Sequence, residues 1–282
     1  MIRIITDTSS DLTLDEAKKL GVTLLPMTIQ FGERTFKDRY EMEPDEFYRL
    51  LISYDEIPVT SQVNPYEFET VFDEVEEAGD EAVVITLSSG LSGTFQSANI
   101  AKGDREFIHI VDSLGVTVSQ QCLVRLAVTL RDKGMSAADI AAEVTREVKN
   151  VKVLGLLDTL EYLKKGGRLS AAAAIAGGVL SIKPVLTTTP DGQVTVIGKA
   201  RGSKNGNNLL KKMIGDCGGI DFSKPIVIAY SGTSKDLLDQ YLEDNKDLYE
   251  GHEDSLSLSR IGSTIGTHAG PGTIAVGFFP RE

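Results

Sequence analysis

The sequence predicts an α/β protein with a parallel β-sheet that helices cover on both faces. Short apolar segments alternate with helical patterns over the first 150 residues, which is typical of parallel strands joined by crossover helices. Beyond residue 150 a hairpin pattern appears, and this favours a second domain with a mixed sheet. The 282-residue chain is therefore divided into 1–150 and 151–282, with some segments expected to cross over.

The elements of the first domain follow in regular order. Residues 2–6 form a short apolar strand, and 12–20 form a helix. Thr13 and Glu16 have the spacing of a capping box, and Gly21 is suited to the helix end. The remaining predicted elements are an extended segment over 22–31, helices over 44–53 and 65–79, a strand over 83–87 with a helix after it, a strand over 107–112 and a helix over 121–134.

The second domain has a different pattern. Residues 151–170 read as a strand, a helix and a Gly-Gly-Arg turn. Ser170 is a candidate N-cap for a helix over 171–181. Residues 183–200 predict a hairpin that turns at Pro190-Asp191-Gly192-Gln193. Two later strands are expected over 224–232 and 273–279, with helices between them.

The composition excludes several classes of partner. The formal net charge of −12 disfavours nucleic acid and anionic membrane surfaces. Cys122 and Cys217 stand apart in the sequence, as expected for free thiols in a cytoplasmic protein. The chain has three histidines without metal-ligand spacing, so no metal site is predicted. The longest apolar run, 171–179, is too short to cross a bilayer.

Polar residues follow three of the predicted strands, at 6–11, 88–94 and 112–113. Ligands of parallel sheets bind at the carboxyl ends of the strands. Hydroxyl groups and free backbone N–H groups at a helix N-terminus bind anions well. Thr60, Ser61 and Gln62 add three hydrogen-bonding side chains just before a helix. These segments predict a site for a small anionic group, although ordinary helix capping explains any one of them.

Three further residues carry alternative interpretations. Ser92 lies in Gly90-Leu91-Ser92-Gly93-Thr94, which is close to the nucleophile elbow of hydrolases. A catalytic triad would then use His268 with Asp7 or Asp112. Arg168 follows Gly166-Gly167 and is either a solvated charge or a phosphate ligand. His268 is expected in a Gly/Pro-rich loop, where it could donate to an anion or move a proton.

Taken together, these motifs resemble the DegV family. The resemblance covers the whole chain in order, and the motifs in register make it specific. The matching segments are Thr6–Leu12, Pro58–Gln62 with Pro65, Ser88–Thr94, Val111–Ser113, Leu160–Ser170, Lys183-Pro184 and His268 with Gly270-Pro271-Gly272.

The resemblance implies a fold, a ligand and a partner. It implies a three-layer α/β/α domain with a parallel sheet, a two-layer α/β domain with a mixed sheet, and a fatty acid in a tunnel between them. It also implies a non-enzymatic subunit without a cofactor, which presents its lipid to a separate ATP-binding fatty acid kinase subunit for acyl phosphate formation. Membrane contact would be transient at most.

The resemblance also assigns residues to the site. Thr60 and Ser92 would hold the carboxylate, within a site that includes Ser61, Gly93, Thr94 and His268. Arg168 and His268 would support phosphoryl transfer. Two alternatives stay open at this point: a serine hydrolase or thioesterase that uses Ser92 and His268, and a binding module for another small anion.

Overall fold

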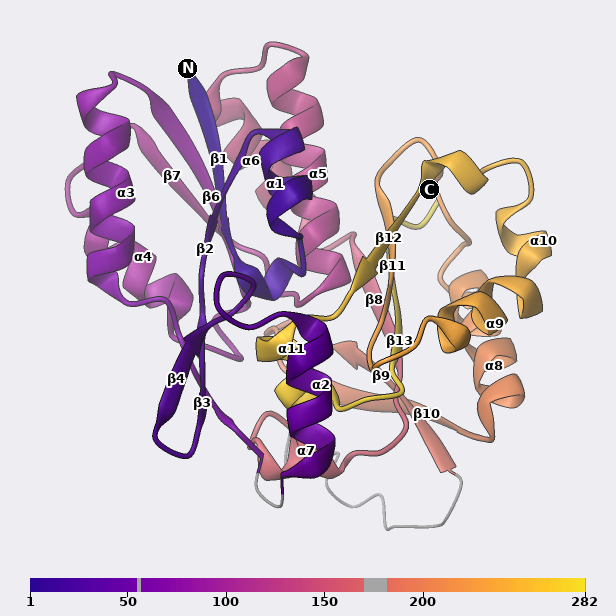
Figure 1. Ribbon diagram of the computed structural model, residues 1–282. Helices are drawn as coiled ribbons and strands as arrows, with labels where there is room; N and C mark the ends of the chain where they lie inside the picture. Colours follow the sequence, from indigo (N-terminus) through magenta and orange to yellow (C-terminus); the bar gives the residue numbers. More distant parts are fainter. Residues whose placement is uncertain (55–56, 170–181, 282) are drawn as a thin grey trace.

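The computed structural model describes residues 1–54, 57–169 and 182–281. These residues form three β-sheets with helices packed on their faces (Figure 1). The first sheet is parallel, as the alternating pattern predicts. Its strand order is β2 (Val22–Leu25), β1 (Ile2–Asp7), β6 (Glu81–Thr86) and β7 (Ile108–Asp112).

Helices cover both faces of this sheet and complete the predicted three-layer unit. Successive side chains of a strand point to opposite faces, so Ile4 and Val83 pack in one apolar cluster while Ile5 and Val84 pack in another. The first cluster lies under α1 (Leu14–Leu20), α5 (Val118–Asp132) and α6 (Ala137–Glu147), and the second under α3 (Pro65–Glu77) and α4 (Thr94–Lys102).

The second sheet is mixed, as predicted. It contains the expected hairpin, in which β9 and β10 pair antiparallel, and one parallel pair, β11 with β12. Its strand order is β10 (Val194–Arg201), β9 (Ile182–Thr188), β8 (Lys152–Leu156), β13 (Ile274–Phe278), β11 (Ile226–Tyr230) and β12 (Leu256–Arg260).

The two faces of the mixed sheet have different partners. Ile274 and Val276 point to the outer layer, which contains α8 (Ser203–Asp216), α9 (Asp236–Asp244) and α10 (Lys246–Tyr249). Ala275 points the other way and joins the cluster that contains α5. A Cβ on Gly277 would meet the Val118 backbone at 2.6 Å, so glycine allows α5 to approach this sheet closely. One apolar core thus connects the first two sheets.

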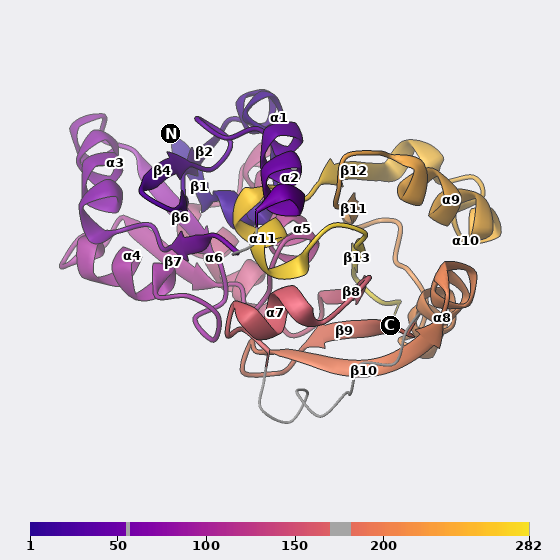
Figure 2. The same ribbon diagram turned by 60° about the horizontal axis from the view of Figure 1, so that its bottom comes forward.

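A third sheet was not predicted. The extended segment 22–31 is split at Pro26, and its second half pairs in a separate antiparallel sheet with the strand order β4 (Arg34–Lys37), β3 (Thr28–Phe31) and β5 (Val59–Ser61). This sheet contacts α11 (Ser263–Ala269). Figure 2 shows α11 between α2 (Pro44–Ser53) and α7 (Glu161–Lys165), which it also contacts.

Two buried carboxylates fix the start of α11. Asp38 accepts hydrogen bonds from the backbone N–H groups of Ser263 and Thr264 at 3.1 and 3.2 Å, and Asp11 accepts one from Gly262 at 2.7 Å. Arg39 pairs with the Asp11 carboxylate at 3.3 Å. A helix N-terminus attracts negative charge, so these contacts tie α11 to loops of the N-terminal half.

The tip of the β9–β10 hairpin packs against the loop after β6. Ser88 donates from its hydroxyl to the Gly192 carbonyl at 2.8 Å. A Cβ on Gly192 would overlap the Ser88 hydroxyl, and a Cβ on Gly90 would meet the Asp191 carbonyl oxygen at 2.6 Å. Glycine is therefore required on both sides of this contact.

The capping predictions are confirmed, but several boundaries differ. Thr13 forms its capping box with Glu16, and Asn64 caps α3. Helix α5 starts at Val118, three residues before the predicted start. Helix α6 was missed, although Ser136 caps it and Ile140 and Val144 mark its apolar face. The short 3-10 helices Thr8–Ser10 and Glu253–Ser255 were also not predicted.

Two predictions are not tested. The helix predicted over 171–181, with Ser170 as its N-cap, lies outside the described residues. The division of the chain at residue 150 stays a prediction. Among the described helices, none is long and apolar enough to cross a membrane.

Replacing Asp38 with alanine removes the acceptor for two N–H groups at the start of α11. We expect Asp38→Ala to lower the free energy of unfolding by about 2–3 kcal/mol, measured by urea denaturation. Asp45→Ala is the matched control, because the exposed Asp45 carboxylate makes only a surface ion pair with Arg260 at 2.9 Å. Asp45→Ala should lower the free energy of unfolding by less than about 1 kcal/mol. Equal losses in the two variants would contradict the role of Asp38.

Candidate functional site

A cavity of about 890 Å³, counting the part that is open to solvent, lies among the three sheets. Most of the lining is apolar, and it comes from strands of the mixed and antiparallel sheets, from loops that follow strands of the parallel sheet, and from α7 and α11. The apolar lining residues are Met27, Leu87, Leu91, Val116, Val153, Leu157, Leu163, Leu186, Val194, Ile261, Ile265, Ala269 and Ala275.

Small residues on the inner face of the mixed sheet leave this space empty. Gly155 and Ala275 are neighbours on β8 and β13 and both line the cavity. Larger side chains at these positions would fill the volume beside α11. At these two positions the sheet therefore adds little bulk to the cavity wall, whereas Val153, Leu186 and Val194 of the same sheet line it with larger side chains.

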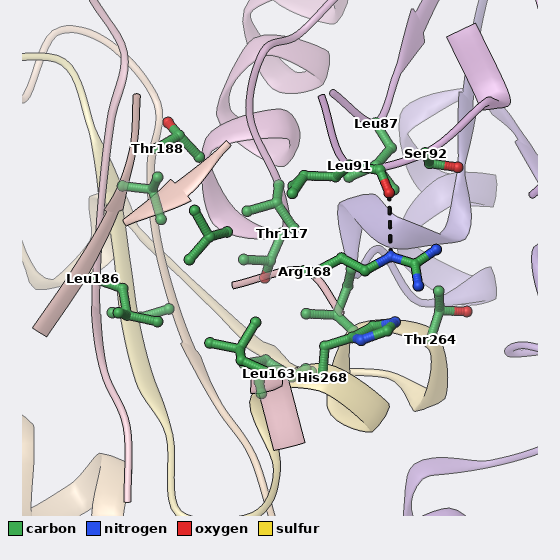
Figure 3. A pocket seen from close by; sticks show the side chains of 18 of the residues that line it. Leu87, Leu91, Ser92, Thr117, Leu163, Arg168, Leu186, Thr188, Thr264 and His268 are labelled. Atoms are coloured by element: carbon green, nitrogen blue, oxygen red, sulfur yellow. Dashed lines mark hydrogen bonds between the residues drawn. The ribbon is translucent and has the colours of Figure 1, made fainter. Parts of the chain in front are cut away.

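Ser92, Arg168 and His268 lie together at one end of the cavity, whereas Thr188 lines it away from them. Figure 3 shows Arg168 and His268 side by side there, with the Ser92 hydroxyl at the same end and Leu186 far from them. Thr60, Ser61 and Gln62 line the cavity as well. The structure thus brings together predicted site residues that are far apart in the sequence.

Thr60 and His268 are joined directly. The Thr60 Oγ1 atom lies 3.0 Å from His268 Nε2. His268 Nδ1 is buried and has no hydrogen-bond partner among the described residues. Burial, with a smaller contribution from the nearby positive charge of Arg168, lowers the pKa of His268 to about 4. The imidazole is therefore neutral at pH 7.

The prediction that His268 lies in a loop is wrong. His268 belongs to the last turn of α11, which ends at Gly270 with a φ of +70°. The glycines around it have packing roles: a Cβ on Gly166 would overlap His268 Nδ1 and one on Gly266 would meet the ring of Phe47 at 2.6 Å. Glycine at these positions lets α7 and α2 pack closely against the helix.

The Ser92-Gly93-Thr94 segment forms the start of α4. The Ser92 and Thr94 hydroxyls lie 2.9 Å apart, and Gly93 is the N-cap without a side-chain capping bond. A side chain at Gly93 would overlap the amide of Gln62. The start of α4 therefore has backbone N–H groups and a hydroxyl close to the cavity, as expected for an anion site.

Arg168 lies at the exposed rim of the polar end. Its guanidinium donates to the Gly166 carbonyl at 2.8 Å and to the Leu91 carbonyl at 3.4 Å. The second contact, drawn in Figure 3, links the turn after α7 to the loop before α4. Backbone carbonyls are its acceptors here, so the positive charge is available to an anion.

The geometry does not form the catalytic triad that the sequence allowed. His268 bonds to Thr60 rather than to Ser92, and no carboxylate bonds to it in the described part of the chain. Asp7 is buried and accepts bonds from the backbone N–H of Leu87 at 2.8 Å and from Ser9 and Gln120. Asp112 accepts the backbone N–H groups of Ser89 and Leu114. Both carboxylates hold loops in place.

Two buried threonines stand out among the lining residues that were not identified from the sequence. Thr117 and Thr264 are buried, and their hydroxyl oxygens have no hydrogen-bond partner among the described residues. Their position at the cavity becomes visible only once α5 and α11 are packed in the structure. The sequence gives no signal for it, because threonine is common in both helices and loops. The described residues also contain no group of three histidine, cysteine or acidic side chains that could hold a metal ion.

A family model described as an uncharacterised protein of the DegV family matches residues 1–281. The chain belongs to the DegV family. A DegV domain-containing protein of Caldanaerobacter subterraneus is 34% identical over 284 residues, which cover 98% of each chain. The family explains why the predicted motifs occur together and in this order.

Solved structures of the family share the fold. A fatty-acid-binding DegV family protein from Thermus thermophilus is 29% identical, with a TM-score of 0.89 and 99% of each chain covered. A fatty-acid-binding DegV family protein from Streptococcus agalactiae is 28% identical, with a TM-score of 0.84 and coverage of 100% of this chain and 99% of that one. The α/β fold with a parallel and a mixed sheet is therefore confirmed.

The low pKa of His268 predicts a pH-dependent stability. The unfolded chain takes up this proton near pH 6.5 and the folded chain near pH 4, so protonation between these values favours unfolding. We expect His268 to make the free energy of unfolding fall as the pH falls through this window, by at most about 3 kcal/mol.

Comparison with His268→Gln isolates this effect. Burial raises the pKa of Asp11 to about 6. The folded chain therefore binds this proton more readily than the unfolded chain, so Asp11 stabilises the fold as the pH falls. This contribution partly masks the opposite effect of His268 on the free energy of unfolding. The difference in unfolding free energy between wild type and His268→Gln should therefore be followed from pH 7 to pH 4. A difference that stays constant with pH would contradict the low pKa.

Proposed function

We propose that this protein binds a long-chain fatty acid in the cavity, with the carboxylate at Thr60 and Ser92. The observation that carries the proposal is a largely apolar cavity with the Thr60 and Ser92 hydroxyls and the His268 imidazole at one end and Arg168 at its rim. The fatty acid binding named for the Thermus thermophilus and Streptococcus agalactiae proteins supports it. The chain would act as a lipid-binding subunit and not as an enzyme.

The bond between Thr60 and His268 suits a carboxylate. If neutral His268 donates from Nε2 to Thr60 Oγ1, the Thr60 hydroxyl keeps its proton for the ligand. Ser92 and the backbone N–H groups at the start of α4 would supply further donors to the same carboxylate. Ser61, Gly93 and Thr94 complete the proposed site. Hydrogen bonds from neutral groups leave the carboxylate charged and nucleophilic.

The tail would supply most of the affinity. Each buried methylene contributes about 0.8 kcal/mol, so a chain of about a dozen methylenes outweighs the head contacts. The leucine, valine and isoleucine side chains of the lining match such a tail. A polar metabolite would leave this surface without a partner, which disfavours the alternative of another small anion.

The exposed position of Arg168 supports the proposed role in a kinase system. A separate ATP-binding subunit would approach the rim, and the Arg168 guanidinium would stabilise charge on the phosphoryl group as it moves to the carboxylate. His268 lies beside Arg168 (Figure 3) and would keep the carboxylate in place. We place this exchange in the cytoplasm, with transient membrane contact at most and no nucleic acid partner.

The first experiment identifies the ligand. The protein is purified from bacterial cells and denatured, and the organic extract is analysed by mass spectrometry. We expect about one fatty acid per chain, whose mass gives its length. An empty extract, together with no uptake of added palmitate, would contradict the proposal. A polar, tail-free ligand would favour the small-anion alternative.

Loss of a head hydroxyl should weaken fatty acid binding. We expect Thr60→Val and Ser92→Ala each to raise the Kd for palmitate by about 5–30-fold, because each removes one hydrogen bond to a charged group. Isothermal titration calorimetry of the lipid-free protein measures this. Ser89→Ala is the control, since Ser89 is exposed and does not line the cavity. An unchanged Kd in both site variants would place the carboxylate elsewhere.

Arg168 should separate binding from phosphorylation. We expect Arg168→Ala to bind palmitate with a Kd within about threefold of wild type, because the exposed guanidinium contributes little to the buried head. With the purified ATP-binding subunit and ATP, acyl phosphate formation should fall by at least about 100-fold. Lys165→Ala, which removes an exposed cation nearby, is the control. Normal acyl phosphate formation by Arg168→Ala would refute the role.

A further inference from the structure

Thr264 has a buried hydroxyl that forms no hydrogen bond with any other described residue. The residue is 2% exposed and lines the cavity, and its Oγ1 atom has no hydrogen-bond partner in the described part of the chain. A buried hydroxyl without a partner is costly, and most such groups in proteins are satisfied. An atom inside the cavity is therefore needed to complete its bonding.

The usual internal hydrogen bond is not formed by this residue. A threonine in a helix commonly donates to the carbonyl four residues earlier, and Thr267 in the same helix does so to Ser263 at 2.8 Å. Four residues before Thr264 is Arg260, which belongs to strand β12 and not to the helix. Its carbonyl already accepts a bond from Arg39 at 2.5 Å. The Thr264 hydroxyl is thus left to the cavity.

Thr264 lies close to the polar end. It stands four residues before His268 on α11, so the two side chains share a face and are separated by about one turn, roughly 5–6 Å. Figure 3 shows the Thr264 hydroxyl at the same end of the cavity as Ser92, Arg168 and His268. Its neighbours in the lining, Ile261 and Ile265, are apolar.

We propose that Thr264 recognises an oxygen on the acyl chain close to the carboxylate, so that 3-hydroxy fatty acids are preferred ligands. The inference rests on the proposed function and adds to it the class of lipid. With the carboxylate at Thr60 and Ser92, the first carbons of the chain pass the preceding turn of α11. A hydroxyl on the third carbon then faces Thr264, and each hydroxyl can donate or accept.

Comparison of the affinities for three lipids of equal length tests this. The lipid-free protein is titrated with palmitate and with each enantiomer of 3-hydroxypalmitate, and the three Kd values are measured by calorimetry. We expect one enantiomer to bind about 5–10-fold more tightly than palmitate, the value of one net hydrogen bond. In Thr264→Val this ratio should fall to about one, while Thr264→Ser should keep it.

The control is Thr267→Val, which removes a buried hydroxyl from the same helix without touching the cavity lining. It should keep the wild-type ratio. Palmitate binding without a preference for either hydroxy acid would overturn the inference and leave the proposed function intact, and so would a preference that persists in Thr264→Val. Failure to bind all three lipids would overturn the proposed function itself.

Discussion

The attachment of α11 to the buried carboxylates of Asp11 and Asp38 determines where the cavity ends. This helix presents both Thr264 and His268, so any shift of its start would move two groups at the polar end together. Asp11 and Arg39 hold left-handed backbone conformations, with φ values of +58° and +67°, that are costly for residues with side chains. Their ionic and helix-end contacts offset that cost.

The cavity itself follows from how the two main sheets share one core. Helix α5 packs on both, because Gly277 removes the side chain that would hold it away from β13. The small residues Gly155 and Ala275 on the same face leave space that α5 does not fill. The apolar side chains around this space would favour an apolar ligand through the hydrophobic effect.

Much of this arrangement can be predicted from the sequence, because it depends on local patterns. The strand and helix alternation indicated the parallel sheet, and the Pro-Asp-Gly turn indicated the hairpin. The local motifs also predict Thr60, Ser92, Arg168 and His268 as site residues, and the structure brings them together at one end of the cavity. The third sheet was missed because its strand β4, Arg34–Lys37, is short and mostly polar and so lacks the apolar pattern that signals a strand. The helical position of His268 was missed because its glycines signal a loop locally, whereas their role is close packing.

The glycine contact between Ser88 and the β9–β10 hairpin has a practical consequence for protein engineering. Hairpin tips at the surface are ordinarily good places to insert a peptide tag, a fluorescent reporter or a foreign domain. Here the tip around Gly192 packs tightly against the loop after β6, so an insertion would push apart two segments that line the cavity. The turn after α6, around Asn150, has no cavity residue and is the better place to attach a probe.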